Sequence, residues 1–205
     1  MPEQLAGDRE ALRLAWDAAS ARDLGALARE SLSRPSDDGR LLLRLMDREC
    51  AVDVRSRSIA FTDDGSPLKP HVQVLVLHYM LGAGKGEPTG EMVTFREFPG
   101  GALYFPAYKK RTLDLLVSRF GADPGALRRA GELMGATPLD KATVAFRTRF
   151  LPKLDVDVLM WAGDDEVPSS ANILFDSCAG RMLSTEDVTV VAGVLCSRLT
   201  ALSRG

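Results

Sequence analysis

Hydrophobic residues recur at helical spacing in three parts of the chain. Residues 3–33 carry an apolar stripe at helical spacing, with a break near Arg22, which predicts two successive helices. The stripe consists of Leu5, Leu12, Trp16, Leu24, Leu27 and Leu32. Residues 70–81 are apolar nearly all round a helical projection, which predicts a buried helix closed by Gly82 just beyond its last turn. Residues 184–203 begin with a capping-box pattern and predict a long C-terminal helix.

Other stretches are short, apolar or alternating, and bounded by turn residues, which is typical of strands. They are residues 40–46, 49–54, 59–61, 144–150, 154–161 and 172–175. If residues 144–150 and 154–161 form a hairpin, Arg149 faces Asp155 and Arg147 faces Asp157 across an exposed surface. The pattern predicts an α+β protein in which small antiparallel sheets or hairpins pack against several helices. We expect an N-terminal helical segment over residues 1–35 and a single α+β domain over residues 36–205.

The segment between the central helix and the second hairpin is rich in aromatic residues and glycine. Residues 92–98 predict a short strand, followed by an ordered loop up to Pro106. Pro106 suits the first turn of a helix that runs to Arg119. Residues 109–111 (Lys-Lys-Arg) would then lie near the positive end of the helix dipole, which favours anions. That unfavourable placement suggests an anionic ligand or an acidic partner, with a solvated basic surface as the alternative.

Composition limits the classes of function. The 205 residues are 45% hydrophobic and 26% charged, as in a globular protein with a substantial core. The net charge of −2 argues against a general role on nucleic acid or anionic membranes. The longest apolar run, residues 72–81, is about half the length of a membrane span. No secretory signal is visible at the start, so we expect a cytoplasmic protein.

Acidic residues follow two strand-like runs and suggest a polar site. Trp161 ends the first run and is followed by Asp164, Asp165 and Glu166, and the second run ends at Asp176-Ser177. Two strands that both deliver acids to their ends would place polar chemistry at one rim.

The central helix carries both histidines of the chain. His71 and His78 are seven residues apart, so two helical turns of about 10 Å separate them, too far for one metal ion. His78 has two interpretations, a hydrogen-bonded core histidine or a ligand or base at a functional site.

Several stretches in combination resemble a bacterial and archaeal family catalogued as domain of unknown function 3786. They are residues 77–81 (LHYML), 95–101 (FREFPGG), 104–108 (YFPAY), 161–168 (WAGDDEVP), 173–177 (ILFDS) and 183–187 (LSTED), within roughly residues 70–200. The resemblance implies no established activity. Some relatives carry an added four-cysteine iron–sulfur segment of the kind seen in corrinoid proteins, which suggests anaerobic cofactor metabolism. This chain has three scattered cysteines and lacks that segment.

Three functional hypotheses follow, and the sequence does not decide whether the protein is an enzyme. The preferred one is a non-catalytic binding or accessory protein with a polar, aromatic cleft for a small anionic ligand or cofactor. A tetrapyrrole such as haem or a corrinoid, with His78 as its ligand, is the specific version. The cleft would be lined by His78, Arg96, Tyr104, Lys109, Arg111, Trp161, Asp164, Glu166, Asp176 and Ser177.

The two alternatives involve a metal or a protein partner. Asp164, Glu166 and Asp176 could hold a divalent metal in a hydrolase or transferase. The chain could also be the protein-interaction subunit of a redox complex. Oligomeric state stays open.

Overall fold

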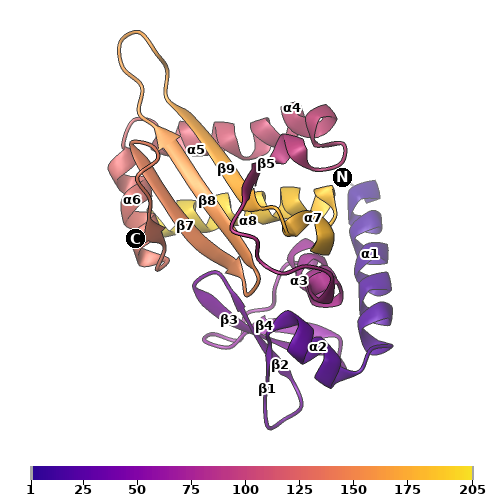
Figure 1. Ribbon diagram of the computed structural model, residues 1–205. Helices are drawn as coiled ribbons and strands as arrows, with labels where there is room; N and C mark the ends of the chain where they lie inside the picture. Colours follow the sequence, from indigo (N-terminus) through magenta and orange to yellow (C-terminus); the bar gives the residue numbers. More distant parts are fainter. Residues whose placement is uncertain (1, 205) are drawn as a thin grey trace.

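The computed structural model describes the backbone of residues 2–204 and the side chains from Arg9 onward. The chain folds as an α+β protein with two antiparallel sheets, a helical N-terminus and a long C-terminal helix (Figure 1). Its α-helices are α1 (Pro2–Ser20), α2 (Leu24–Ser31), α3 (Pro70–Gly82), α4 (Gly101–Arg111), α5 (Leu113–Phe120), α6 (Pro124–Leu133), α7 (Ala179–Met182) and α8 (Thr185–Leu202). Two 3-10 turns, η1 (Ala83–Lys85) and η2 (Phe95–Glu97), complete the helical elements among the described residues.

The two sheets come from different parts of the chain. The first has four strands in the order β1 (Arg34–Pro35), β2 (Leu41–Leu45), β3 (Arg48–Asp53) and β4 (Ser58–Phe61). The second has five strands in the order β5 (Met92–Thr94), β9 (Ser170–Asp176), β8 (Leu154–Trp161), β7 (Val144–Leu151) and β6 (Thr137–Pro138). Every pairing within them is antiparallel.

The predicted register of the β7–β8 hairpin is confirmed. Arg147 pairs with Asp157 and Arg149 with Asp155. The expectation that both pairs lie on an exposed surface is wrong for Asp157, which is fully buried. Arg147 Nε donates to Asp157 at 2.6 Å and Lys141 Nζ donates to it at 3.3 Å. Two cations therefore neutralise this carboxylate, as a buried charge requires.

One continuous core extends from the first sheet to the second, and part of it lies between the second sheet and the helices behind it. Helix α5 contacts β9, α6 contacts β7, and α8 packs against both helices (Figure 1). Phe146, Val156 and Val158 of the hairpin are buried on this side. Asp123 caps the N-terminus of α6, because its side chain accepts from the Ala126 N–H at 3.1 Å.

Helix α3 joins the two halves of the molecule through Tyr79. This side chain is fully buried, and its hydroxyl donates to the Ser31 carbonyl at 3.0 Å and accepts from the Lys153 N–H at 3.1 Å. The first sheet is tied to the second by a hydrogen bond from Met46 N to Phe150 O at 2.9 Å. Helices α1 and α2 both pack against α3. The division of the chain at residue 35 stays a prediction.

Two predicted helix boundaries are wrong. Helix α4 begins at Gly101, so Pro106 lies inside it and most of the predicted loop is helical. Gly100 adopts a left-handed conformation at φ 72°, and a β-carbon on Gly101 would lie 2.0 Å from the Phe95 carbonyl. The two glycines thus let the helix start directly above η2.

Lys109, Lys110 and Arg111 consequently lie in the last turn of α4. Basic residues are favourable at the C-terminal end of a helix, where the dipole is negative. Their placement is therefore not unfavourable, and it no longer suggests an anionic ligand. Gly82 is also not the residue beyond α3. It is the last residue of the helix, and a β-carbon there would lie 2.0 Å from the Met182 carbonyl of α7.

Candidate functional site

The predicted acidic rim does not form. Strands β8 and β9 are antiparallel, with Trp161 opposite Ser170 and Val156 opposite Phe175. The acids that follow β8 therefore lie at the start of β9, whereas Asp176 lies at its far end. Six residue steps along a strand span about 20 Å, too far for one metal ion to bind both groups. Among the described residues, no group of three or more His, Cys, Asp or Glu side chains is placed to hold a metal.

Asp176 orders the loop that precedes β5. Its buried carboxylate accepts from the N–H groups of Thr89, Gly90 and Cys178, at distances from 2.7 to 3.1 Å. Burial alone would raise the pKa of Asp176, but these hydrogen bonds hold that pKa well below its ordinary value. Ser177 Oγ lies 2.8 Å from Thr89 Oγ1 in the same loop junction. Both predicted site residues thus have structural partners.

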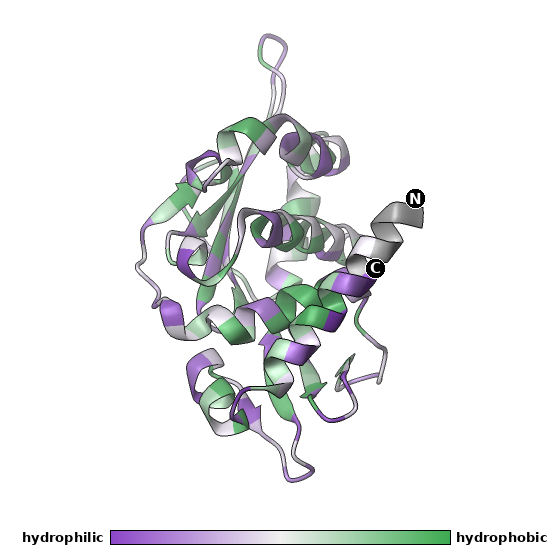
Figure 2. Ribbon diagram, turned by 90° about the vertical axis from the view of Figure 1, so that its right-hand side faces the viewer, coloured by the Kyte–Doolittle hydropathy of each residue, from purple (hydrophilic) through white to green (hydrophobic). Residues whose placement is uncertain are grey.

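The acids after β8 lie on a loop that stands clear of the body (Figures 1 and 2). Asp164 accepts from the N–H groups of Glu166 and Val167 at 2.9 and 2.8 Å, so it shapes the turn. These backbone N–H groups, Val167 first, lower the pKa of Asp164. Glu166 is exposed, and Trp161 is 40% exposed at the base of the loop.

Two of the predicted cations have partners on their own segment. Lys109 forms an ion pair with Asp114 of α5. The Arg96 guanidinium lies 3.8 Å from the centre of the Phe105 ring. Neither contact reaches the acidic loop, so the predicted cleft between a basic and an acidic side is not assembled.

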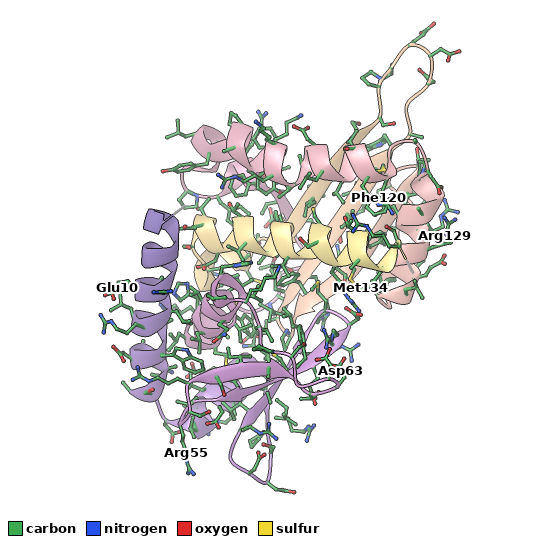
Figure 3. The ribbon with its side chains drawn as sticks, turned by 180° about the vertical axis from the view of Figure 1, so that it is seen from behind. Glu10, Arg55, Asp63, Phe120, Arg129 and Met134 are labelled. Carbon is green, nitrogen blue, oxygen red and sulfur yellow. The ribbon has the colours of Figure 1, made fainter. Side chains whose placement is uncertain are left out.

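A large cavity lies elsewhere, between α8, the first sheet and the start of α3. Its volume is about 710 Å³, within the range typical of sites for small ligands. Figure 3 shows α8 running between the α4–α5 layer and the N-terminal strands. One stripe of α8 forms a wall, with Thr189, Val190, Gly193, Val194, Ser197 and Arg198. The opposite wall is mainly apolar and includes Leu45, Met46, Phe61, Leu68 and Val72.

Positive charge predominates around this cavity. Arg48, Lys69, Arg111 and Arg198 line it, together with His71, against the single carboxylate of Asp47. Arg198 Nε donates to Asp47 at 3.0 Å, and Arg48 pairs with Asp64 at 2.8 Å outside the cavity lining. Among the described residues, the side chains of Lys69 and Arg111 have no hydrogen bond or ion pair. An anion that contacts either of these cations does not have to displace a carboxylate.

A second groove, of about 530 Å³, lies between α4 and the start of α8. Tyr104, Ala107, Tyr108 and Arg111 of α4 form one wall, and Ser184, Thr185, Glu186 and Thr189 form the other, over Phe95. Arg111 and Thr189 line both the cavity and the groove. Of the predicted site residues, Tyr104 and Arg111 line this groove together, whereas Asp176 and Ser177 lie together at the Thr89 loop junction.

His78 lies outside both the cavity and the groove. Its Nδ1 is 2.9 Å from Asp187 Oδ1, and the ring is partly exposed. This hydrogen bond raises the pKa of His78. Such a bond would orient Nε2 for a metal, but neither hollow offers space for a macrocycle beside the ring. A haem or corrinoid held by His78 stays a prediction.

The sequence did not predict the cavity, because its walls come mainly from α8 and the first sheet, to which the sequence assigns only a structural role. One signal was present in the C-terminal helix. Val190, Gly193 and Val194 form an apolar and small stripe beside the main core face, with a glycine in mid-helix. A glycine in the middle of a helix, with no turn beside it, indicates either close packing of another element or space kept for a functional reason.

The fold and this cavity define an α+β protein with an apolar hollow edged by cations. The chain belongs to the family described as domain of unknown function DUF3786, which matches residues 23–198. No curated protein and no solved structure matches the chain significantly. Among the described residues, no helix is long and apolar enough to cross a membrane.

Proposed function

We propose that this protein binds a small anionic ligand with an apolar body, in the cavity between α8 and the first sheet. The observation that carries the proposal is the combination of apolar walls with Lys69 and Arg111, two cations without partners among the described residues. Folding gains little from an empty apolar cavity, since its lining atoms lose dispersion contacts. An amphiphilic anion would restore those contacts and neutralise the two cations.

Binding of a small anionic ligand is the function that the sequence also suggests, but the cavity is at a different place from the predicted cleft. Arg111 lines the cavity and the groove, and Tyr104 lines the groove alone, so both stay candidate ligand-binding residues. Neither space is bordered by Asp176, Ser177, Lys109 or the acidic loop. A metal-dependent hydrolase that uses Asp164, Glu166 and Asp176 has no support from their placement. No specific observation favours a redox-complex subunit. The protein would bind this ligand in the cytoplasm, where the sequence predicts that it is located.

The test uses dodecanoate as the probe and compares three variants with the unchanged protein by calorimetry. Gly193→Phe fills the cavity from α8, because a β-carbon at Gly193 meets no atom within 4 Å. Arg111→Ala removes one cation, and Gly193→Ala is the matched control for the helix position. We expect Gly193→Phe to weaken binding by more than tenfold and Arg111→Ala by about tenfold, equivalent to about 1.4 kcal/mol. Gly193→Ala should bind as the unchanged protein does.

Dodecanol, the neutral analogue, should bind the unchanged protein more weakly than dodecanoate. Equal affinity for Gly193→Phe and Gly193→Ala would overturn the proposed location, and equal affinity for the acid and the alcohol would overturn the role of charge. An absorption spectrum of the purified protein gives a separate check. A visible band that is lost in His78→Ala would favour the tetrapyrrole hypothesis over this one.

A further inference from the structure

The cavity and the α4–α8 groove share part of their walls, and this bears on the shape of the ligand. Arg111 and Thr189 belong to the walls of both spaces. The volume is about 710 Å³ for the cavity and about 530 Å³ for the groove. A ligand whose charged group contacts Arg111 can therefore extend in two directions.

The two spaces differ in chemistry. The cavity offers aliphatic side chains from α8 and from the first sheet, which suit a flexible apolar chain. The groove offers aromatic side chains from α4, with Tyr104 63% exposed and the buried Tyr108 ring stacked on Phe95 at 3.9 Å. The exposed aromatic face of Tyr104 on the groove wall suits a planar ring.

The opposite wall of the groove adds hydrogen-bond acceptors. Glu186 of α8 is exposed, and its carboxylate interacts electrostatically with His78 but has no hydrogen bond or ion pair among the described side chains. A carboxylate on a groove wall can accept from N–H or O–H groups. This favours a planar ring that carries donors over a plain hydrocarbon ring.

We infer that the site takes a bipartite ligand, in which an apolar chain in the cavity and a planar, donor-bearing ring in the groove are joined through an anionic group at Arg111. The inference rests on the proposed function and specifies its ligand class. A nucleoside linked through phosphate to an alkyl chain has this chemistry. Tyr104 then sets the preference for the ring, and Gly193 leaves room for the chain.

The test uses three probes that differ by one part each. They are the dodecyl ester of adenosine 5′-monophosphate, methyl dodecyl phosphate, which keeps the chain and the single charge, and adenosine 5′-monophosphate, which lacks the chain. We expect the nucleoside ester to bind at least tenfold more tightly than methyl dodecyl phosphate. Tyr104→Ala should abolish that advantage and leave the affinity for methyl dodecyl phosphate unchanged.

Gly193→Phe should weaken both alkyl probes by more than tenfold without changing the affinity for adenosine 5′-monophosphate. Arg111→Ala should weaken all three probes. Tyr104 and Arg111 are exposed, so these variants are expected to fold, which circular dichroism would check.

Two failures can be told apart. If methyl dodecyl phosphate binds in the cavity but the nucleoside ester binds no more tightly, or if Tyr104→Ala weakens both equally, the bipartite ligand is wrong and the proposed function stands. If methyl dodecyl phosphate and dodecanoate do not bind the unchanged protein, the proposed function fails, and this inference fails with it.

Discussion

Two glycines in helices, Gly82 and Gly193, show how differently the two sides of this molecule are packed. Gly82 ends α3 where the Met182 carbonyl of α7 lies 2.0 Å from the position of an added β-carbon. Gly193 lies in the middle of α8, where an added β-carbon meets no atom within 4 Å. One glycine permits contact between two backbones, and the other borders open space.

The difference indicates which region is optimised for folding. In the C-terminal half of α3 the chain is closely packed, and the hydroxyl of the buried Tyr79 makes two hydrogen bonds. Along α8 the chain leaves a cavity and keeps a residue that lowers helix stability. A local departure from good packing with no structural gain is typical of a functional site.

The largest expected effect is that of Gly82→Ala. Alanine normally stabilises a helix relative to glycine, but here its β-carbon would overlap the Met182 carbonyl. Relief requires a shift of the α7 backbone, so the free energy of unfolding should fall by about 3 kcal/mol or more. Urea denaturation followed by circular dichroism measures this change. A loss below about 1 kcal/mol would show that α3 and α7 do not approach so closely.

A smaller effect is expected at His78, where the closely packed side meets the start of α8. The bond to Asp187 raises the pKa of His78. The protonated ring therefore stabilises the fold below the unfolded pKa of histidine, and this contribution is lost as pH rises through the folded pKa. His78→Gln should cost about 1 kcal/mol at pH 5.5, since partial exposure screens the pair, and less at pH 9.

The measurement is urea denaturation of both proteins at the two pH values. Asp187 has a lowered pKa, because bonds from His78 and Ser184 outweigh its burial, and it stays ionised in both conditions. If the unchanged protein and His78→Gln differ in stability by the same amount at pH 5.5 and pH 9, the bond to Asp187 does not raise the pKa of His78.

Much of the fold was predictable because it depends on local pattern. The strand runs of residues 144–161, the Asp123-Pro124 helix start and the capping box at Ser184 each carry their signal within a few residues. The boundary of α4 was not predictable in the same way. Pro106 is common in first turns, but the Gly100-Gly101 pair overrides it by allowing the helix to start five residues earlier, on top of Phe95.

The site was less predictable, because it depends on which distant elements meet. Asp164 and Asp176 each follow an apolar run, but antiparallel pairing places them at opposite ends of β9. Arg111 and Lys69 are more than forty residues apart, and only the packing of α3 and α4 against α8 puts both at one cavity. Free cations have no sequence signal that separates them from paired ones such as Lys109.

The smallest expected effect has the opposite sign and tests the open side directly. Gly193→Ala adds one methyl group to the α8 wall of the cavity, where nothing lies within 4 Å of it. The substitution lowers the conformational entropy of the unfolded chain without strain, so the free energy of unfolding should rise by about 0.5 kcal/mol. Urea denaturation under the conditions used for Gly82→Ala measures the change, and the two variants act as controls for each other. If Gly193→Ala instead destabilises the protein, the space beside α8 is filled in solution, and the contrast between the two sides is lost. If Gly193→Ala stabilises the protein and keeps its affinity for dodecanoate, Gly193 is needed neither for helix stability nor for contact with a neighbouring backbone. The space beside Gly193 is then the remaining reason for a glycine at this position.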